Sequence, residues 1–195
     1  MDSREKILQQ VKKSQPPPSP LPELNPRQSQ SYESLQKFVR SLGNIGGTAI
    51  EATNWKEIDS YIRDRFPPPA RCISLIPELG SQGINGELEK DPRMLENVSV
   101  SILAGHFAVA ENGAVWITEE KMGDRVLPFI CEHLILVVDA SAVHESMQDA
   151  YELLDSSAYS FGTFIAGPSK TADIEQSLVL GAHGPKTLTV FLLHA

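Results

Sequence analysis

The stretch HLILVVDASAVHESMQDAYELLD, residues 133–155, decides how the rest of the chain is interpreted. It opens on an uninterrupted apolar run, which is typical of a strand that is covered on both faces of a sheet. Apolar residues then recur on one stripe at helical spacing, at Val143, Met147, Ala150 and Leu154. A buried strand followed by an amphipathic helix is the repeating unit of an α/β fold.

The same alternation of strands and helices continues on both sides of this unit. An apolar stripe predicts a helix over residues 31–42 that ends at Gly43. A second helix is predicted after Asn54, which can cap it while Glu57 reaches back toward the cap. Short apolar runs predict strands at 46–52, 71–77, 98–104, 106–110, 113–118, 161–167 and 187–193.

This order of elements predicts an α/β fold with an open, mostly parallel sheet and helices on both faces. It is the architecture of a layered domain whose ligands collect at the ends of strands. The pair Asn112-Gly113 predicts a tight hairpin, because both residues tolerate positive φ. We therefore expect one antiparallel hairpin within the sheet.

The N-terminal part of the chain differs from the rest. Its first residues predict a short helix, and QPPPSPLPELNP, residues 15–26, predicts a stiff Pro-rich strap, because proline lacks the backbone donor and favours extended conformations. We divide the chain into an N-terminal helix and strap, residues 1–30, and a single α/β domain, residues 31–195.

Composition limits the classes of function. The 195 residues carry a net charge of −8, which argues against binding nucleic acid through a broad basic surface. Cys72 and Cys131 are the only cysteines, too few for a structural zinc or an iron–sulfur cluster, which usually take about four ligands. No secretory segment and no apolar run of about 20 residues is present, so we expect a cytoplasmic protein without a membrane span.

The segment GPSKTADIEQSLVLGAHGP, residues 167–185, follows a predicted strand and is the first candidate site. It predicts a short helix capped by Ser169 or Thr171, whose first-turn amides would suit a carboxylate or phosphate. The alternative is an ordinary capped helix without a ligand. The candidate ligand-binding residues here are Gly167, Ser169, Lys170, Thr171, Asp173, Glu175 and His183.

The hairpin AENGAVWIT, residues 110–118, is the second candidate. Glu111 stands at the end of an apolar strand, where a carboxylate can act as a base or nucleophile, with Asn112 and Gly113 beside a ligand. The alternative is that Glu111 is an exposed turn residue. A third candidate is Arg125, which could hold a carboxylate through two hydrogen bonds or be paired locally.

Nearly the whole chain resembles the LUD-domain family of lactate utilization proteins. The features that carry the resemblance are the opening helix MDSREKIL (1–8), the Pro-rich strap, AENGAVWI (110–117), GDRVLPFICEHLILVV (123–138) and, most specifically, GPSKTADIEQSLVLGAHGPKTLTVFLL (167–193). The resemblance implies a fold similar to sugar-phosphate isomerases and CoA transferases. It also implies a role in oxidising L-lactate to pyruvate alongside iron–sulfur partner proteins.

Three functions follow as alternatives. The first is an accessory or ligand-binding subunit that binds no cofactor alone and relies on iron–sulfur clusters in partner subunits, because no dinucleotide fingerprint follows a strand. The second is a CoA-transferase-like or isomerase-like enzyme acting on a small carboxylate or phosphate compound, with Glu111 as nucleophile or base. The third is a non-catalytic interaction module.

Overall fold

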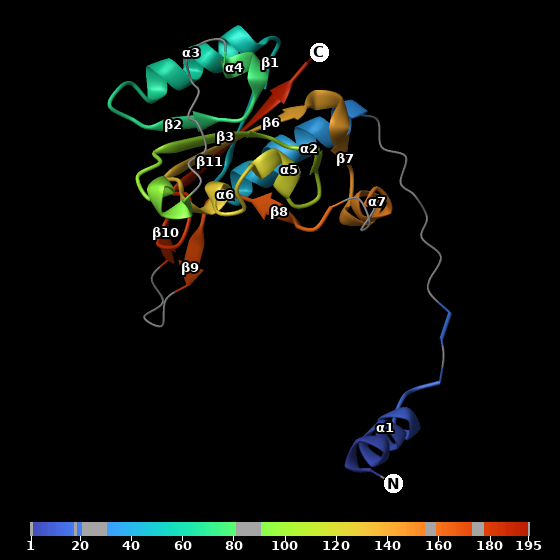
Figure 1. The fold of residues 1–195 in the computed structure, drawn as a ribbon. Coiled ribbons are helices and arrows are strands. Elements are labelled where there is room, and N and C mark those ends of the chain that lie inside the picture. Colours follow the sequence, from blue (N-terminus) through green and yellow to red (C-terminus); the bar gives the residue numbers. More distant parts are fainter. Residues whose placement is uncertain are drawn as a thin grey trace.

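The computed structural model describes residues 2–17, 19–20, 31–80, 91–154, 159–172 and 178–194. A five-stranded sheet lies at its centre, and every neighbouring pair of strands in it is parallel (Figure 1). In spatial order its strands are β1 (Thr48–Ala52), β11 (Thr187–Leu193), β6 (His133–Asp139), β3 (Val100–Ala104) and β2 (Cys72–Ser74). The predicted α/β class with a mostly parallel sheet is confirmed.

A second, mixed sheet packs on the first. In order its strands are β7 (Val143–His144), β4 (Phe107–Val109), β5 (Ala114–Thr118) and β8 (Gly162–Ala166). Strand β5 is antiparallel to both β4 and β8, and β4 is parallel to β7. The expected hairpin is therefore β4–β5, but the expectation that it lies within the parallel sheet is wrong.

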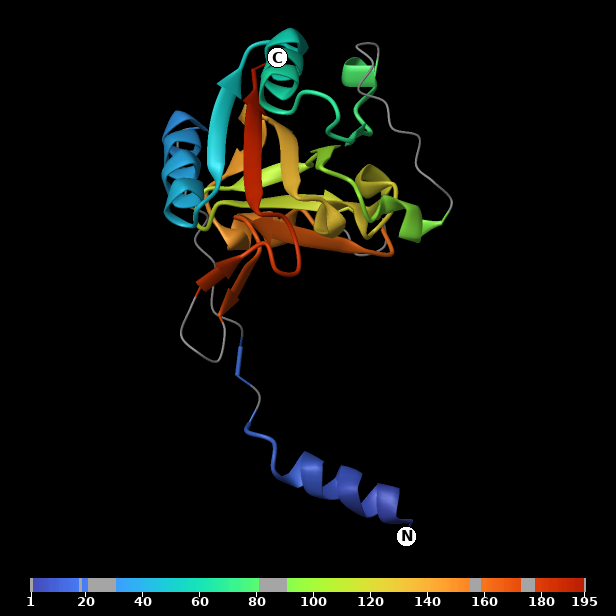
Figure 2. The same cartoon turned by 90° about the vertical axis from the view of Figure 1, so that its left-hand side faces the viewer.

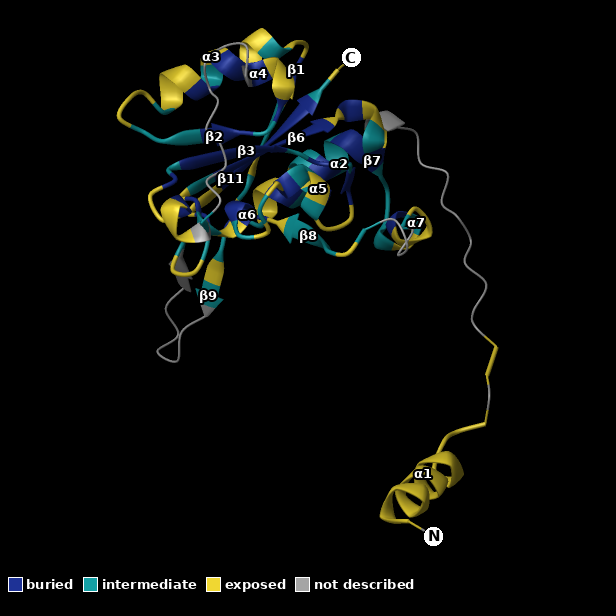
Figure 3. Cartoon of the chain, in the orientation of Figure 1, coloured by how far each residue is buried: buried dark blue, intermediate teal, exposed yellow. Residues whose placement is uncertain are grey.

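Helices lie on both faces of the parallel sheet, as expected. Helices α3 (Trp55–Arg65) and α4 (Pro77–Gly80) pack on one face, and α2 (Ser31–Asn44), α5 (Glu119–Met122) and α6 (Leu127–Ile130) pack on the other together with the mixed sheet. Helix α7 (Met147–Glu152) packs on the outer face of the mixed sheet, and short 3₁₀ turns lie at Pro92–Leu95 and Ala140–Ala142. The first helix, α1 (Ser3–Lys13), has no buried residue and lies apart from the body (Figures 1 and 3). Among the described residues, none of the helices is both long and apolar enough to cross a bilayer.

Strand β6 shows why its sequence is apolar without interruption. Leu134 and Leu136 join the large cluster that contains α2 and the mixed sheet. Ile135 and Val137 point to the opposite face, into the cluster that contains α3. Successive side chains of a strand point to opposite faces, so a strand between two covering layers needs apolar residues at every position.

The local signal at the start of α3 is confirmed with one change. The Asn54 side chain accepts a hydrogen bond from the Glu57 backbone N–H at 3.1 Å. The Glu57 carboxylate reaches back one residue beyond the cap, to the Thr53 backbone N–H at 2.8 Å. These contacts satisfy amides that the first helical turn leaves without partners.

The helix expected to begin near Val143 starts later. Val143 belongs to β7, where it pairs with Ala108 of β4. Helix α7 begins only after Ser146, whose hydroxyl accepts from the Asp149 backbone N–H while the Asp149 carboxylate accepts from the Ser146 backbone N–H. This capping box fixes the start of the helix, so the apolar stripe is divided between a strand and a helix.

In the described residues that follow Gly167, no helix begins at Ser169 or Thr171, so the predicted capped start is wrong. Residues 170–172 and 178–180 form an antiparallel pair, β9 and β10, which projects from the body in both views (Figures 1 and 2). The Ser169 backbone N–H donates to the Pro185 carbonyl at 2.8 Å, so Ser169 serves a loop pairing and caps no helix. Tertiary pairing here overrides a local capping pattern.

Gly113, in the loop between β4 and β5, packs closely against the backbone of α2. We expect its substitution by alanine to destabilise the fold. Its φ is +71°, and a Cβ would lie 2.8 Å from the backbone N and Cα of Leu42. Left-handed strain and backbone overlap together should lower the free energy of unfolding by roughly 2–4 kcal/mol, measured by urea denaturation.

Gly43 provides the matched control. It lies in α2 with open space around its Cα, so Gly43→Ala should leave stability unchanged or raise it by about 0.5–1 kcal/mol. Equal effects of the two substitutions would contradict the close packing of Gly113 on α2.

Candidate functional site

The outer face of the mixed sheet carries the larger of the two cavities described below. Ala108 of β4 and Val115 of β5 face the core. Successive side chains of a strand point to opposite faces, so their neighbours Phe107 and Trp116 face outward, where they pack with Phe164 of β8. Phe107 and Trp116 are direct partners in the β4–β5 ladder.

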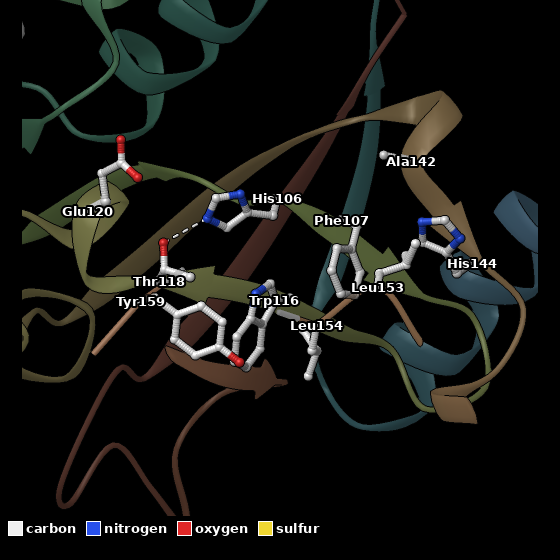
Figure 4. Close-up of a pocket in the computed structure, with 10 residues that line it drawn as sticks. All are labelled: His106, Phe107, Trp116, Thr118, Glu120, Ala142, His144, Leu153, Leu154 and Tyr159. Atoms are coloured by element: carbon white, nitrogen blue, oxygen red, sulfur yellow. Dashed lines mark hydrogen bonds between the residues drawn. The ribbon is translucent and has the colours of Figure 1, made fainter. Parts of the chain in front are cut away.

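This cavity has a volume of about 400 Å³, within the range of small-molecule sites, about 300–1,000 Å³. Strands β4 and β5 form one wall, and α7 with the residues after it contributes to the rim (Figure 4). Its lining residues are His106, Phe107, Trp116, Thr118, Glu120, Ala142, His144, Leu153, Leu154 and Tyr159.

A polar pair stands at one end of the cavity. The His106 Nε2 lies 2.7 Å from the hydroxyl oxygen of Thr118, which is itself buried (Figure 4). Burial lowers the pKa of His106, the positive charge of Lys121 lowers it further, and Glu120 partly opposes the shift. The neutral imidazole is therefore the dominant form at pH 7, with one N–H donor and one acceptor nitrogen.

The other walls are mostly rings and aliphatic side chains. His144 lies edge-on to Phe107, with ring centroids 5.3 Å apart. Tyr159 lies edge-on to Trp116, with centroids 5.4 Å apart. Leu153 and Leu154 follow α7 and complete the rim. The cavity is thus apolar along its length and polar at the His106–Thr118 end.

Glu111, predicted as nucleophile or base, lies on the exposed hairpin loop and lines neither cavity. Its carboxylate accepts a hydrogen bond from the Met147 backbone N–H at 2.9 Å, at the first residue of α7. The Asn112 side chain accepts from the Ala114 backbone N–H at 3.0 Å, which closes the loop. The Glu111 contact attaches α7 to the hairpin. A catalytic role for Glu111 stays a prediction.

A second, smaller cavity, of about 250 Å³, brings together three of the candidate ligand-binding residues of the first segment: Gly167, Ser169 and His183. Phe129 and Pro185 lie beside them in its lining. These residues meet in space although no helix begins at Ser169 or Thr171. Ligand binding there stays a prediction.

The remaining candidates lie elsewhere. Lys170 and Thr171 are on β9 and are not part of this lining, and Asp173 and Glu175 lie outside the described residues. Arg125 forms an ion pair with Glu119, with Nε 2.9 Å from the carboxylate oxygen. Its guanidinium also lies 5.3 Å from the centroid of the Phe161 ring. Of the two alternatives for Arg125, the structure shows the second: its guanidinium is paired locally, with Glu119.

Sequence reasoning missed the residues of the larger cavity. His106, Trp116 and Thr118 fall in runs that were treated as uniformly apolar strands. A signal was present in the sequence. Each of the two strands carries one bulky ring, Phe107 in HFAVA and Trp116 in GAVWIT, next to small or aliphatic residues that suit the opposite face.

The two cysteines lie on opposite faces of the parallel sheet. Cys131 is buried in the cluster that contains α2, whereas Cys72 packs against the cluster that contains α3. Burial raises the pKa of both thiols. They therefore cannot serve one common ligand. In the described part of the chain, no group of three or more His, Cys, Asp or Glu is arranged to hold a metal ion.

Comparison with known proteins gives a consistent family assignment. The family model of the LUD domain matches residues 87–193. Lactate utilization protein C of Geobacillus thermodenitrificans is 34% identical over 135 residues, which are 66% of this chain and 53% of that protein. Lactate utilization protein C of Bacillus subtilis is 29% identical over 103 residues, 50% of this chain and 43% of that protein.

The chain spans about half the length of the curated relatives that it matches. A crystal structure of a DUF162 family protein from Deinococcus radiodurans has the same fold, with a TM-score of 0.67 and 16% sequence identity. The match covers 85% of this chain and 99% of that one.

The His106 environment gives a prediction for NMR titration of its ring protons. The midpoint should lie below the ordinary value of 6.5. Lys121→Met should raise the midpoint, because it removes a repelling positive charge. Glu120→Gln should lower it further. Shifts of the same sign in the two variants would contradict the electrostatics described for this site.

Stability should depend on pH in the corresponding direction. The folded-state pKa of His106 is lower than its unfolded value, so the unfolded chain takes up a proton first as pH falls. The free energy of unfolding should therefore fall as pH is lowered through 6.5 toward the folded-state pKa, and His133 adds to the same trend. His106→Gln should reduce the loss between pH 7.5 and 5.5, measured by urea denaturation.

Proposed function

The chain belongs to the LUD-domain family, and we propose that it acts in lactate utilization as a ligand-binding subunit of an L-lactate-oxidising system. The printed names of its relatives support the pathway. The single observation that supports a ligand-binding role is the 400 Å³ cavity with the His106–Thr118 pair at its polar end.

Electron transfer would belong to partner proteins. Oxidation of lactate to pyruvate releases two electrons, which need an acceptor such as a flavin, a nicotinamide or an iron–sulfur cluster. An iron–sulfur cluster is usually held by about four cysteines, and this chain has two, packed on opposite faces of the sheet. We therefore propose that iron–sulfur proteins accept the electrons and that this subunit contributes a binding cavity.

The His106–Thr118 pair supports a defined role for this chain within such a system. A neutral imidazole beside a buried hydroxyl can donate one hydrogen bond to a bound ligand and accept another. The surrounding rings are apolar, and hydrogen bonds are stronger in an environment less polar than water. The pair would orient the ligand while the partners carry the redox centres.

The proposal predicts a specific growth defect. Disruption of the gene should abolish growth on L-lactate and leave growth on pyruvate intact, because only the step before pyruvate is lost. Complementation with the wild-type gene should restore growth on L-lactate. Thr118→Val, which removes the cavity hydroxyl and keeps the side-chain shape, should restore it poorly.

Thr48→Val makes the same substitution at an exposed position of β1 that lines neither cavity; it is the matched control and should complement fully. Protein levels of the variants, compared by immunoblot, separate loss of function from loss of folding. Normal growth of the disrupted strain on L-lactate would refute the assignment to lactate utilization. Full oxidation of L-lactate by the purified chain alone with an artificial acceptor would refute the dependence on partners.

A further inference from the structure

We propose that the larger cavity binds an uncharged conjugated ring that carries carbonyl groups, about the size of a naphthoquinone. The inference rests on the proposed function in one respect, namely that this cavity is the ligand site of the chain. It goes further by naming the chemical class of the occupant.

The aromatic lining supports a ring as the ligand. Phe107 and Trp116 sit side by side on paired strand positions, with centroids 6.5 Å apart and planes only 23° from parallel. Tyr159 adds a third ring beside Trp116 (Figure 4). A conjugated ligand gains offset-stacked or edge contacts with such side chains in addition to the burial of its apolar surface.

The polar end supports carbonyl groups on that ring. His106 and Thr118 are already hydrogen-bonded to each other at 2.7 Å, so together they have few further donors to offer. One remaining N–H or O–H matches a ring carbonyl, which needs a single donor. A carboxylate or phosphate would be held better by a guanidinium or an ammonium group, which supplies charge and several donors.

The charge of the lining supports an uncharged ligand. Glu120 is the only Asp, Glu, Lys or Arg in the lining, and Figure 4 shows it at the edge of the group, apart from the rings. The ammonium group of Lys121, next to it in sequence, donates to the Gly105 carbonyl at 3.2 Å. A phosphate-bearing ligand would thus meet Glu120 at the edge of the lining and no Lys or Arg within the lining itself.

Size leads to the same class. A volume of about 400 Å³ falls in the range that encloses drug-sized molecules. A three-carbon acid would leave most of this space unfilled, so its contacts with the rings would be few. A bicyclic ring would contact the aromatic wall and reach the His106–Thr118 end at once.

The two tryptophans of the chain make the test specific. Trp55→Phe leaves Trp116, in the cavity wall, as the only tryptophan, whose emission is excited selectively over that of tyrosine at the red edge of the absorption band. Trp116→Phe leaves Trp55, which lies on α3 and packs against the far face of the parallel sheet. Each variant is titrated with 2,3-dimethyl-1,4-naphthoquinone, whose blocked ring positions prevent thiol addition, with lumichrome, and with L-lactate, and intensities are corrected for ligand absorption.

The proposal predicts saturable quenching of Trp116 by at least one of the two ring compounds, with Trp55 unaffected. Thr118→Val in the Trp55→Phe background should weaken binding by roughly 2- to 10-fold, the effect of losing one hydrogen bond. His106→Gln provides a second cavity variant if Thr118→Val does not fold. Thr48→Val in the same background, at an exposed position of β1 outside both cavities, should leave the affinity unchanged.

The titrations distinguish which class of ring binds and which results would overturn the inference. Quenching by the naphthoquinone alone assigns the site to quinones, and quenching by lumichrome alone assigns it to flavin-type rings. A response of Trp116 to L-lactate and to neither ring would overturn the inference and leave the proposed function standing. Equal quenching of both reporters, or no response of Trp116 to any compound, would overturn the inference as well.

Discussion

The arrangement of this protein depends on one constraint: strands β4 and β5 must bury one face against the parallel sheet. Ala108 and Val115 satisfy it by joining the main core. Because side chains alternate along a strand, the same backbone then presents Phe107 and Trp116 on the opposite face. The wall of the larger cavity is thus a geometric consequence of core packing.

The parallel sheet and the order of its elements could be predicted because their signals are local. Strand β6 is apolar at every position since both of its faces are covered, and such a run is visible in the sequence. The cap of α3 is likewise set by three neighbouring residues, Thr53, Asn54 and Glu57. These features need no knowledge of the rest of the fold.

The candidate site could not be predicted in the same way, because it depends on the pairing of strands. A two-residue turn at Asn112-Gly113 would have placed Glu111 opposite Ala114. The actual loop is longer and places Val109 there, which frees Glu111 to hold the start of α7. The segment after Gly167 was misjudged for a related reason, since residues 170–172 pair as a strand with residues 178–180 of the same segment rather than forming the first turn of a helix.

The family relation and the cavity support the division of labour that we propose, in which this subunit binds a ligand and partner proteins carry electrons. The most direct test is a pair of crystal structures of the protein, one grown with 2,3-dimethyl-1,4-naphthoquinone and one with lumichrome. The account predicts density for at least one of these rings against Trp116, with a carbonyl oxygen within hydrogen-bond distance of His106 or Thr118. A cavity that is empty in both crystals at saturating ligand, or ligand bound only beside Ser169 and His183, would contradict it.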